Sequence, residues 1–77
     1  MRELVKVIAE SLVEYPDQVV VTETDRGQDI LIVLQVAPSD MGKVIGRKGR
    51  IAKAIRDVVK AASSKSDKKV IVEIGNE

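Results

Sequence analysis

The order of hydrophobic patterns along the chain restricts its fold more than any other feature of the sequence. In residues 1–15, apolar side chains recur every three or four positions, the period of a helix with one buried face, and Pro16 ends the pattern. A β-branched run at 19–24 predicts a strand, and Gly27 can adopt positive φ in the hairpin turn that follows. Segment 29–38 places Ile, Leu and Val on one face and mostly apolar residues on the other, which predicts a central strand. The first half therefore predicts a helix and a β-hairpin.

In the second half of the chain, helical spacing of apolar residues is again followed by the pattern of a strand. A brief helix is expected to start at Ser39 as N-cap, with Asp40 in its first turn, and to end at Gly46. A longer helix follows from Arg50, then a polar connection, and a last strand at 69–75. Two helices leave enough chain for a crossover, so the second and third strands can be parallel. We predict an α+β fold, α-β-β-α-α-β, with a three-stranded mixed sheet and three helices packed on one face.

The residue types in the chain exclude several kinds of site. There is no cysteine and no histidine, so a disulfide framework, a thiolate metal site and the most common general base are absent. We therefore expect a protein that is not an enzyme and has no cofactor, no metal and no small-molecule substrate. Tyr15 is the one aromatic residue, so aliphatic side chains must fill the core.

Length and the N-terminal pattern give expectations about organisation and location. A chain of 77 residues suffices for one domain, and we expect residues 1–77 to form it. The N-terminal segment mixes charged residues among its apolar ones, so it contains neither a signal peptide's apolar stretch nor a membrane span. We expect a cytoplasmic protein without membrane contact.

The positive charge is concentrated in one segment. Residues 43–60 contain seven basic residues and one acidic residue, a net charge of +6, and because the whole chain carries +1 the remainder carries −5. A continuous basic segment of this kind is typical of a site that binds a polyanion.

Gly46 and Gly49 enclose two cations, Arg47 and Lys48, between the two central helices. Because glycine lacks Cβ, a sugar-phosphate backbone can approach such a turn closely. The free amides at the start of the following helix are expected to face the phosphates. Arg can donate to two phosphate oxygens, whereas Lys acts as a point charge. Like charges this close repel, which favours an anion between them.

In this setting the sequence resembles a KH domain, which is marked by a Gly-x-x-Gly loop between two helices that clamps a few nucleotides. The loop, the flanking apolar residues Val44, Ile45 and Ile51, the element order and the length together resemble the type II KH domain of small bacterial KhpA-type (YlqC-like) RNA-binding proteins. The resemblance covers essentially the whole chain. It implies single-stranded RNA bound in a groove between the two helices and the sheet, with those apolar residues touching the bases.

The same resemblance implies a role as an RNA chaperone or post-transcriptional regulator, connected with cell shape. It also implies a homodimer, or a heterodimer with a larger KH-containing protein, without indicating the residues of the interface.

The predicted RNA-binding residues surround the glycine turn and are Lys43, Val44, Ile45, Gly46, Arg47, Lys48, Gly49, Arg50, Ile51 and Lys53. Arg56 and Lys60 lie opposite the apolar stripe of their helix, where a solvated charged face is expected. Because only Tyr15 could stack on a base, we expect weak affinity and loose sequence preference.

The sequence also allows other interpretations of the glycine turn and of the function. Two glycines between helices often form only a C-cap and a tight connection, but the crowded cations disfavour that interpretation. The alternative function is a protein-interaction adaptor whose RNA affinity depends on a partner, and a lesser alternative is an enzyme using Lys and a carboxylate. Leu31, Val33 and Ile71 would face outward from the sheet, where a contiguous apolar patch would indicate a partner.

Overall fold

The computed structural model describes residues 1–65 and 67–75 of the chain. Ser66, which belongs to the predicted polar connection, lies outside the described residues. The helices and strands, in chain order, are α1 (Arg2–Leu12), β1 (Val20–Asp25), β2 (Asp29–Gln35), α2 (Met41–Ile45), α3 (Arg50–Ala62) and β3 (Lys69–Gly75). Three short 3-10 turns, Pro16–Gln18, Pro38–Asp40 and Arg47–Gly49, precede β1, α2 and α3. The predicted element order is confirmed.

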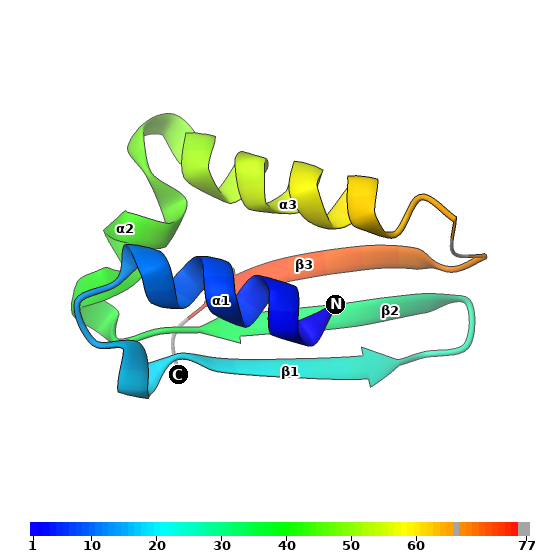
Figure 1. Ribbon diagram of the computed structural model, residues 1–77, viewed down its shortest axis with the longest axis horizontal. Coiled ribbons are helices and arrows are strands. Elements are labelled where there is room, and N and C mark those ends of the chain that lie inside the picture. Colours follow the sequence, from blue (N-terminus) through cyan, green and yellow to red (C-terminus); the bar gives the residue numbers. More distant parts are fainter. Residues whose placement is uncertain (66, 76–77) are drawn as a thin grey trace.

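The three strands form one sheet in the order β1-β2-β3, with β2 in the centre. β1 is antiparallel to β2, where Thr22 faces Val33, and β2 is parallel to β3, where Ile32 faces Val72. The parallel pair is possible because α2 and α3 carry the chain back across the sheet (Figure 1). The mixed sheet predicted from the sequence is confirmed.

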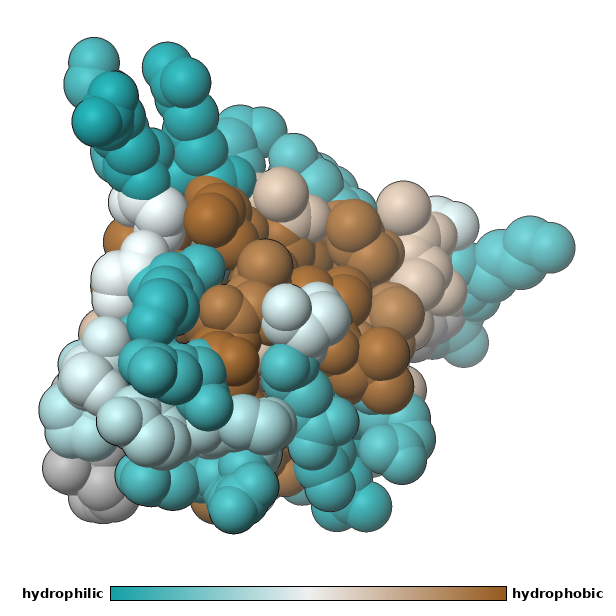
Figure 2. Space-filling model, turned by 60° about the vertical axis from the view of Figure 1, so that its left-hand side comes forward, coloured by the Kyte–Doolittle hydropathy of each residue, from teal (hydrophilic) through white to brown (hydrophobic). Residues whose placement is uncertain are grey.

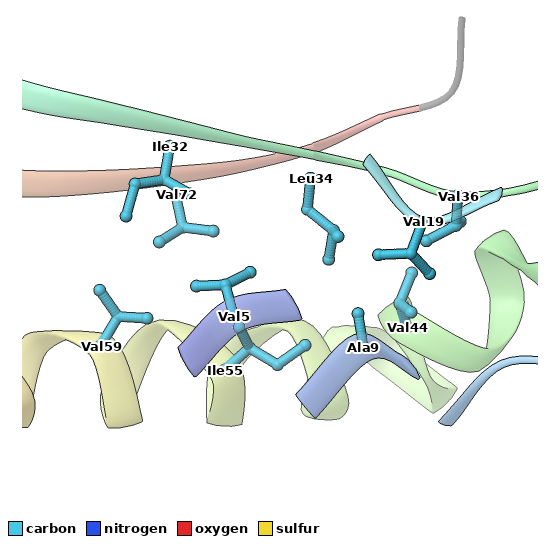
Figure 3. Packing of buried hydrophobic residues seen from close by; sticks show 10 residues of the cluster. All are labelled: Val5, Ala9, Val19, Ile32, Leu34, Val36, Val44, Ile55, Val59 and Val72. Carbon is cyan, nitrogen blue, oxygen red and sulfur yellow. The ribbon is translucent and has the colours of Figure 1, made fainter. Parts of the chain in front are cut away.

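The core lies between the sheet and the three helices, all on one face (Figure 3). Ile32 and Leu34 of β2 are fully buried against Val5 of α1 and Val59 of α3, and all of these side chains are aliphatic. Burial of one such side chain stabilises the fold by about 1.5–3 kcal/mol. The core therefore holds α3 against the sheet without any aromatic residue.

No helix formed by the described residues covers the opposite face of the sheet. There Leu31 lies between Thr24 and Ile71, and Val33 lies between Thr22 and Glu73. Leu31, Val33 and Ile71 are therefore neighbours on this face, each half-buried, and the polar residues Thr22, Thr24 and Glu73 border them. The apolar area is small, as is ordinary for a solvated sheet face.

Two helix ends differ from the expected ones. α1 ends at Leu12, and Val13 is already extended, with φ −99° and ψ 160°. The N-cap of α2 is Asp40, not Ser39, and no side chain caps that end. The two ends meet at Asp40, because its carboxylate accepts hydrogen bonds from the backbone amides of Glu14 and Tyr15 in the chain that follows α1.

Candidate nucleic-acid interface

The Gly46–Gly49 turn, called here the glycine loop, projects between α2 and α3 at one end of the molecule (Figure 1). The amide of Gly46 donates to the Gly42 carbonyl at 2.8 Å and closes α2. Gly46 then adopts φ 76° and ψ 175°, a combination essentially restricted to glycine. Lys48 and Gly49 follow in the left-handed region, with φ 58° and 74°, before α3 starts. The loop thus reverses the chain direction within four residues.

The two glycines of the loop have different surroundings. A Cβ on Gly46 would lie 2.6 Å from Cγ1 of Ile51, so the backbone packs directly on that side chain. A Cβ on Gly49 would meet no atom within 4 Å. Gly46 is needed for packing and conformation, whereas Gly49 leaves an open surface at which a ligand backbone can approach.

The expectation of free amides at the start of α3 is wrong for the first two. The amide of Gly49 donates to the Gly46 carbonyl at 3.2 Å, and the amide of Arg50 donates to the Arg47 carbonyl. These bonds form because the loop closes into a 3-10 turn, whose amides bond to carbonyls three residues back. Attraction for an anion at this point therefore comes from the side chains and from the positive end of the α3 dipole.

Three cations at the loop carry full, unbalanced charges. Arg47, Lys48 and Arg50 are exposed, and within residues 1–65 and 67–75 no ion pair includes any of them. Mutual repulsion of such close charges is unfavourable unless an anion binds. Their crowding at an open turn favours a phosphate ligand.

The other two predicted cations are paired with acidic side chains. Lys43 Nζ lies 3.3 Å from Asp40 Oδ1 and 3.5 Å from Glu14 Oε1, and its hydrogen bond to the Asp40 carboxylate raises the pKa of Lys43. Lys53 Nζ lies 2.9 Å from Asp57 Oδ2, on the exposed face of α3. An exposed pair of the second kind contributes little stability, about 0–1 kcal/mol, so Lys53 can exchange its partner for a phosphate more easily than Lys43 can.

The prediction that Val44 touches RNA is wrong. Its side chain is 0% exposed and belongs to the core, because α2 rests on the sheet with this residue inward. Ile45, the next residue, is 36% exposed, and Ile51 is partly buried under Gly46. Ile45 and Ile51 are thus the predicted apolar residues that are open to a ligand beside the loop.

Asp40 is a positioning residue that the sequence did not reveal as one. Its fully buried carboxylate accepts hydrogen bonds from the amides of Glu14 at 3.1 Å and Tyr15 at 3.0 Å, and from Lys43 Nζ. Burial raises the pKa of Asp40, but these three donors outweigh it and hold the pKa below its ordinary value. The carboxylate ties the chain after α1 to the start of α2, which carries the glycine loop. Because two of its partners are backbone amides 25 and 26 residues away, no sequence pattern indicates this link.

An apolar groove of about 380 Å³ runs between α1 and α3, lined mainly by Ile8, Leu12, Ile51, Ala54 and Val58. Figure 2 shows hydrophobic side chains gathered over this helical face, with hydrophilic ones around them. Val58 is 44% exposed there. The sequence directed attention to the outer face of the sheet instead, although apolar residues at neighbouring positions of α3, Val58 and Val59, indicate a stripe wider than the core needs.

In the described part of the chain, no group of three or more histidine, cysteine, aspartate or glutamate residues could hold a metal ion. Among the described residues, no helix has the length and apolar character needed to cross a membrane.

A mixed three-stranded sheet whose parallel strands are joined by two helices, with a Gly-x-x-Gly loop between those helices, defines a KH domain of type II. The sequence model of the family described as "KhpA/KhpB, KH domain" matches residues 2–74. The chain therefore belongs to the KhpA/KhpB KH-domain family.

Curated relatives match over nearly their full lengths. Three bacterial proteins called "RNA-binding protein KhpA", from Clostridium acetobutylicum, Clostridium perfringens and Caldanaerobacter subterraneus subsp. tengcongensis, are 58%, 60% and 62% identical to this chain over 74 residues. Each alignment covers 96% of this chain and 99% of the relative. No solved structure matches the chain.

Proposed function

We propose that this protein binds single-stranded RNA without catalysing a reaction, and that the glycine loop holds the sugar-phosphate backbone. The observation that carries the proposal is the set of exposed cations, Arg47, Lys48 and Arg50, which form no ion pair with any described residue, around a turn whose Gly49 is open to close approach. Arg47 would donate to two phosphate oxygens and Lys48 would add a point charge. The names of the relatives, which are called RNA-binding proteins, support this function.

Base contacts would be made by Ile45 and Ile51, together with hydrogen bonds. Aromatic stacking contributes about 1–3 kcal/mol per base where it occurs, and Tyr15, the one aromatic residue, belongs to the connection between α1 and β1. We therefore expect weak binding and loose sequence preference. Such binding suits an RNA chaperone or post-transcriptional regulator in the cytoplasm, with residues 1–77 acting as a single KH domain.

The apolar groove between α1 and α3 supports pairing with another protein as part of the proposed function. A second copy of this chain or a larger KH-containing protein would cover it, and the name of the family includes two proteins, KhpA and KhpB. The same groove favours the alternative function, an adaptor whose RNA affinity belongs to its partner.

The test compares the protein with a variant carrying Arg47→Asp and Lys48→Asp for binding to a labelled pool of single-stranded RNA. Binding by the unaltered protein should weaken with salt, with a log-log slope of about 0.7 per phosphate contacted, and the variant should bind more than about tenfold more weakly. A matched control with Arg2→Asp and Lys6→Asp, an equal charge change on α1, should bind nearly as well as the unaltered protein. Equal binding by the loop variant and the unaltered protein would favour the adaptor instead.

A further inference from the structure

The outer edge of β1 is open to another strand. β1 is an edge strand, and in the ranges 1–65 and 67–75 no other strand pairs with its outer side (Figure 1). Five of its six residues are exposed, and none of them is proline. The other edge strand, β3, differs, because Arg56 Nε donates to its Val72 carbonyl at 3.3 Å. An edge as bare as that of β1 is a template for strand pairing.

The register of the hairpin shows which backbone groups are free at this edge. At the end of the hairpin, the amide of Arg26 donates to the Asp29 carbonyl at 2.9 Å. The pairing continues without a bulge, and in an antiparallel pair every second residue bonds to the neighbouring strand. Counting back from Arg26, Val21 and Glu23 therefore direct their N–H and C=O groups away from β2. An extended polypeptide has the same repeat and can bond to these groups in succession.

An open groove lies beside this edge, between β1 and the first half of α1, which contacts it. One part, of about 290 Å³, is lined by Arg2, Glu3, Lys6 and residues 19–21. Another part, of about 400 Å³, is lined by residues 1–3 and by Glu23. Because the two parts share Arg2 and Glu3, they form one groove along most of β1, called here the edge groove.

The charged side chains of the edge groove are available to a ligand. All four are exposed and, in the part of the chain that the structure describes, take part in no ion pair: Arg2, Glu3, Lys6 and Glu23. Arg2 and Lys6 are four residues apart, so they lie on one side of α1 and about 6 Å apart along its axis. Alternate side chains of a strand share a face and are about 6.8 Å apart. Two acidic residues in alternate positions of an added strand therefore match these two cations.

We propose that the edge groove binds an extended segment of a partner protein, which joins the sheet as a fourth strand antiparallel to β1. Its acidic side chains lie opposite Val21 and Val19, where they face Arg2 and Lys6, and a lysine two residues earlier lies opposite Glu23. Strand addition of this kind derives affinity from main-chain hydrogen bonds and specificity from alternate side chains. The charge pattern of the segment is basic-x-acidic-x-acidic.

The edge groove favours a peptide over a nucleic acid. The alternating N–H and C=O groups of β1 match the main chain of a strand, whereas a phosphate backbone has no N–H groups to bond the carbonyls. Glu3 and Glu23 would also repel phosphates. The glycine loop contributes no residue to the edge groove, so this inference does not depend on RNA binding.

The test titrates the ¹⁵N-labelled protein with the peptide Thr-Lys-Val-Glu-Val-Glu-Thr and follows the amide resonances by NMR. Binding should shift the amides of Val21 and Glu23 most and slow their hydrogen exchange. Methylation of the backbone nitrogen of the first glutamate, which lies opposite Val21, preserves the charge but removes one hydrogen bond between the strands. This methylated peptide should bind about fivefold more weakly.

The charge pattern is tested by reversal. A variant with Arg2→Glu and Lys6→Glu should bind the first peptide about tenfold more weakly, and should bind Thr-Glu-Val-Lys-Val-Lys-Thr more tightly than the unaltered protein does. The matched control carries Lys60→Glu and Lys69→Glu, the same change of charge on α3 and β3, and should bind the first peptide like the unaltered protein. Circular dichroism confirms that each variant is folded, as expected for exposed side chains.

Three results would overturn the inference. The first is that the peptide leaves the amides of Val21 and Glu23 unshifted. The second is that a uridine decamer shifts these amides and binds less tightly when Arg2 and Lys6 are reversed, which would make the edge groove an RNA surface. The third is that these amides become protected in the protein alone as its concentration rises, which would show that β1 pairs with a second copy. RNA binding at the glycine loop would stand in each case.

Discussion

At the scale of single residues, three positive φ angles in a row of four residues determine what the glycine loop can do. Gly46, Lys48 and Gly49 have φ of 76°, 58° and 74°. A non-glycine residue in the left-handed region costs about 1–2 kcal/mol, so Lys48 is held there at the expense of stability. Such strain persists only where the surroundings fix it, and it aims the Lys48 side chain away from the fold.

The two glycines should respond differently to the same substitution. Gly46→Ala should lower the free energy of unfolding by about 2–4 kcal/mol, because positive φ is added to an overlap of the new Cβ with Ile51, 2.6 Å from its Cγ1. Gly49→Ala should cost only about 1–2 kcal/mol, since no atom lies within 4 Å, but it should weaken RNA binding by occupying the open surface. Denaturant unfolding and RNA titration of both variants check this. Equal losses of stability would contradict the packing argument for Gly46.

At the scale of elements, α2 depends on its neighbours because it has only five residues. Isolated helices this short are unstable in water, so Val44 in the core and Asp40 at its start must hold α2 in place. The Asp40 carboxylate bonds the amides of Glu14 and Tyr15, which fixes α2 against the end of α1. The glycine loop is positioned through these contacts.

Asp40→Asn should therefore lower the unfolding temperature by about 5–15 °C, because the amide that replaces the carboxylate can accept from one backbone amide but directs its own N–H groups at another donor. Asp57→Asn, which breaks the exposed pair with Lys53, should cost less than about 4 °C. Thermal unfolding followed by circular dichroism measures both. Similar losses in the two variants would show that the buried contacts of Asp40 carry no special weight.

The difference in unfolding temperature between the unaltered protein and Asp40→Asn should depend on pH, because the pKa of Asp40 is lowered in the folded protein. As the pH falls, the Asp40 carboxylate is protonated first in the unfolded chain, near its ordinary pKa of 3.8, and in the folded protein only at lower pH. The stabilisation is complete above that value and is lost as the pH falls through the pKa of the folded protein. The gap in unfolding temperature between the unaltered protein and Asp40→Asn should thus be constant from about pH 7 to about pH 5 and shrink below that value. A gap that widens in acid would be inconsistent with this assignment.

The same elements show how much the sequence could predict. Alternation in 29–38 and 69–75 identified the parallel strands, and the spacing of Gly46 and Gly49 identified the loop, because these patterns are local. Val44 and Ile45 could not be separated, since a five-residue helix has too few turns to distinguish its buried side from its exposed one. The Asp40 carboxylate accepts from the amides of Glu14 and Tyr15, and Arg56 Nε donates to the Val72 carbonyl. These partners are distant in the chain, so the contacts follow only from the assembled fold.

At the scale of the whole molecule, α3 separates surfaces of different chemistry. The apolar groove lies between α3 and α1, a groove lined by Arg56 and Lys60 lies between α3 and β3, and the glycine loop lies at the N-terminal end of α3. An RNA strand held at the glycine loop and continuing between α3 and β3 would leave the apolar groove uncovered. A protein partner and an RNA strand can therefore bind the same molecule without competing for side chains other than Arg50 and Ile51.

This separation predicts that self-association and RNA binding can be lost independently. If the apolar groove is the surface of the proposed self-association, the unaltered protein should form dimers as its concentration rises. Ala54→Glu places a charge in that groove at an exposed helical position, so this variant should fold normally and stay monomeric at the same concentrations. Ala61→Glu, the same substitution at an exposed position of α3 outside that groove, should dimerise like the unaltered protein. Sedimentation velocity over a range of concentrations distinguishes the variants, and RNA affinity should be similar in both because each adds one negative charge to α3. If Ala54→Glu dimerises as well as Ala61→Glu, the partner surface is not this groove. If Ala54→Glu loses RNA affinity together with dimerisation while Ala61→Glu keeps both, the two functions share one surface.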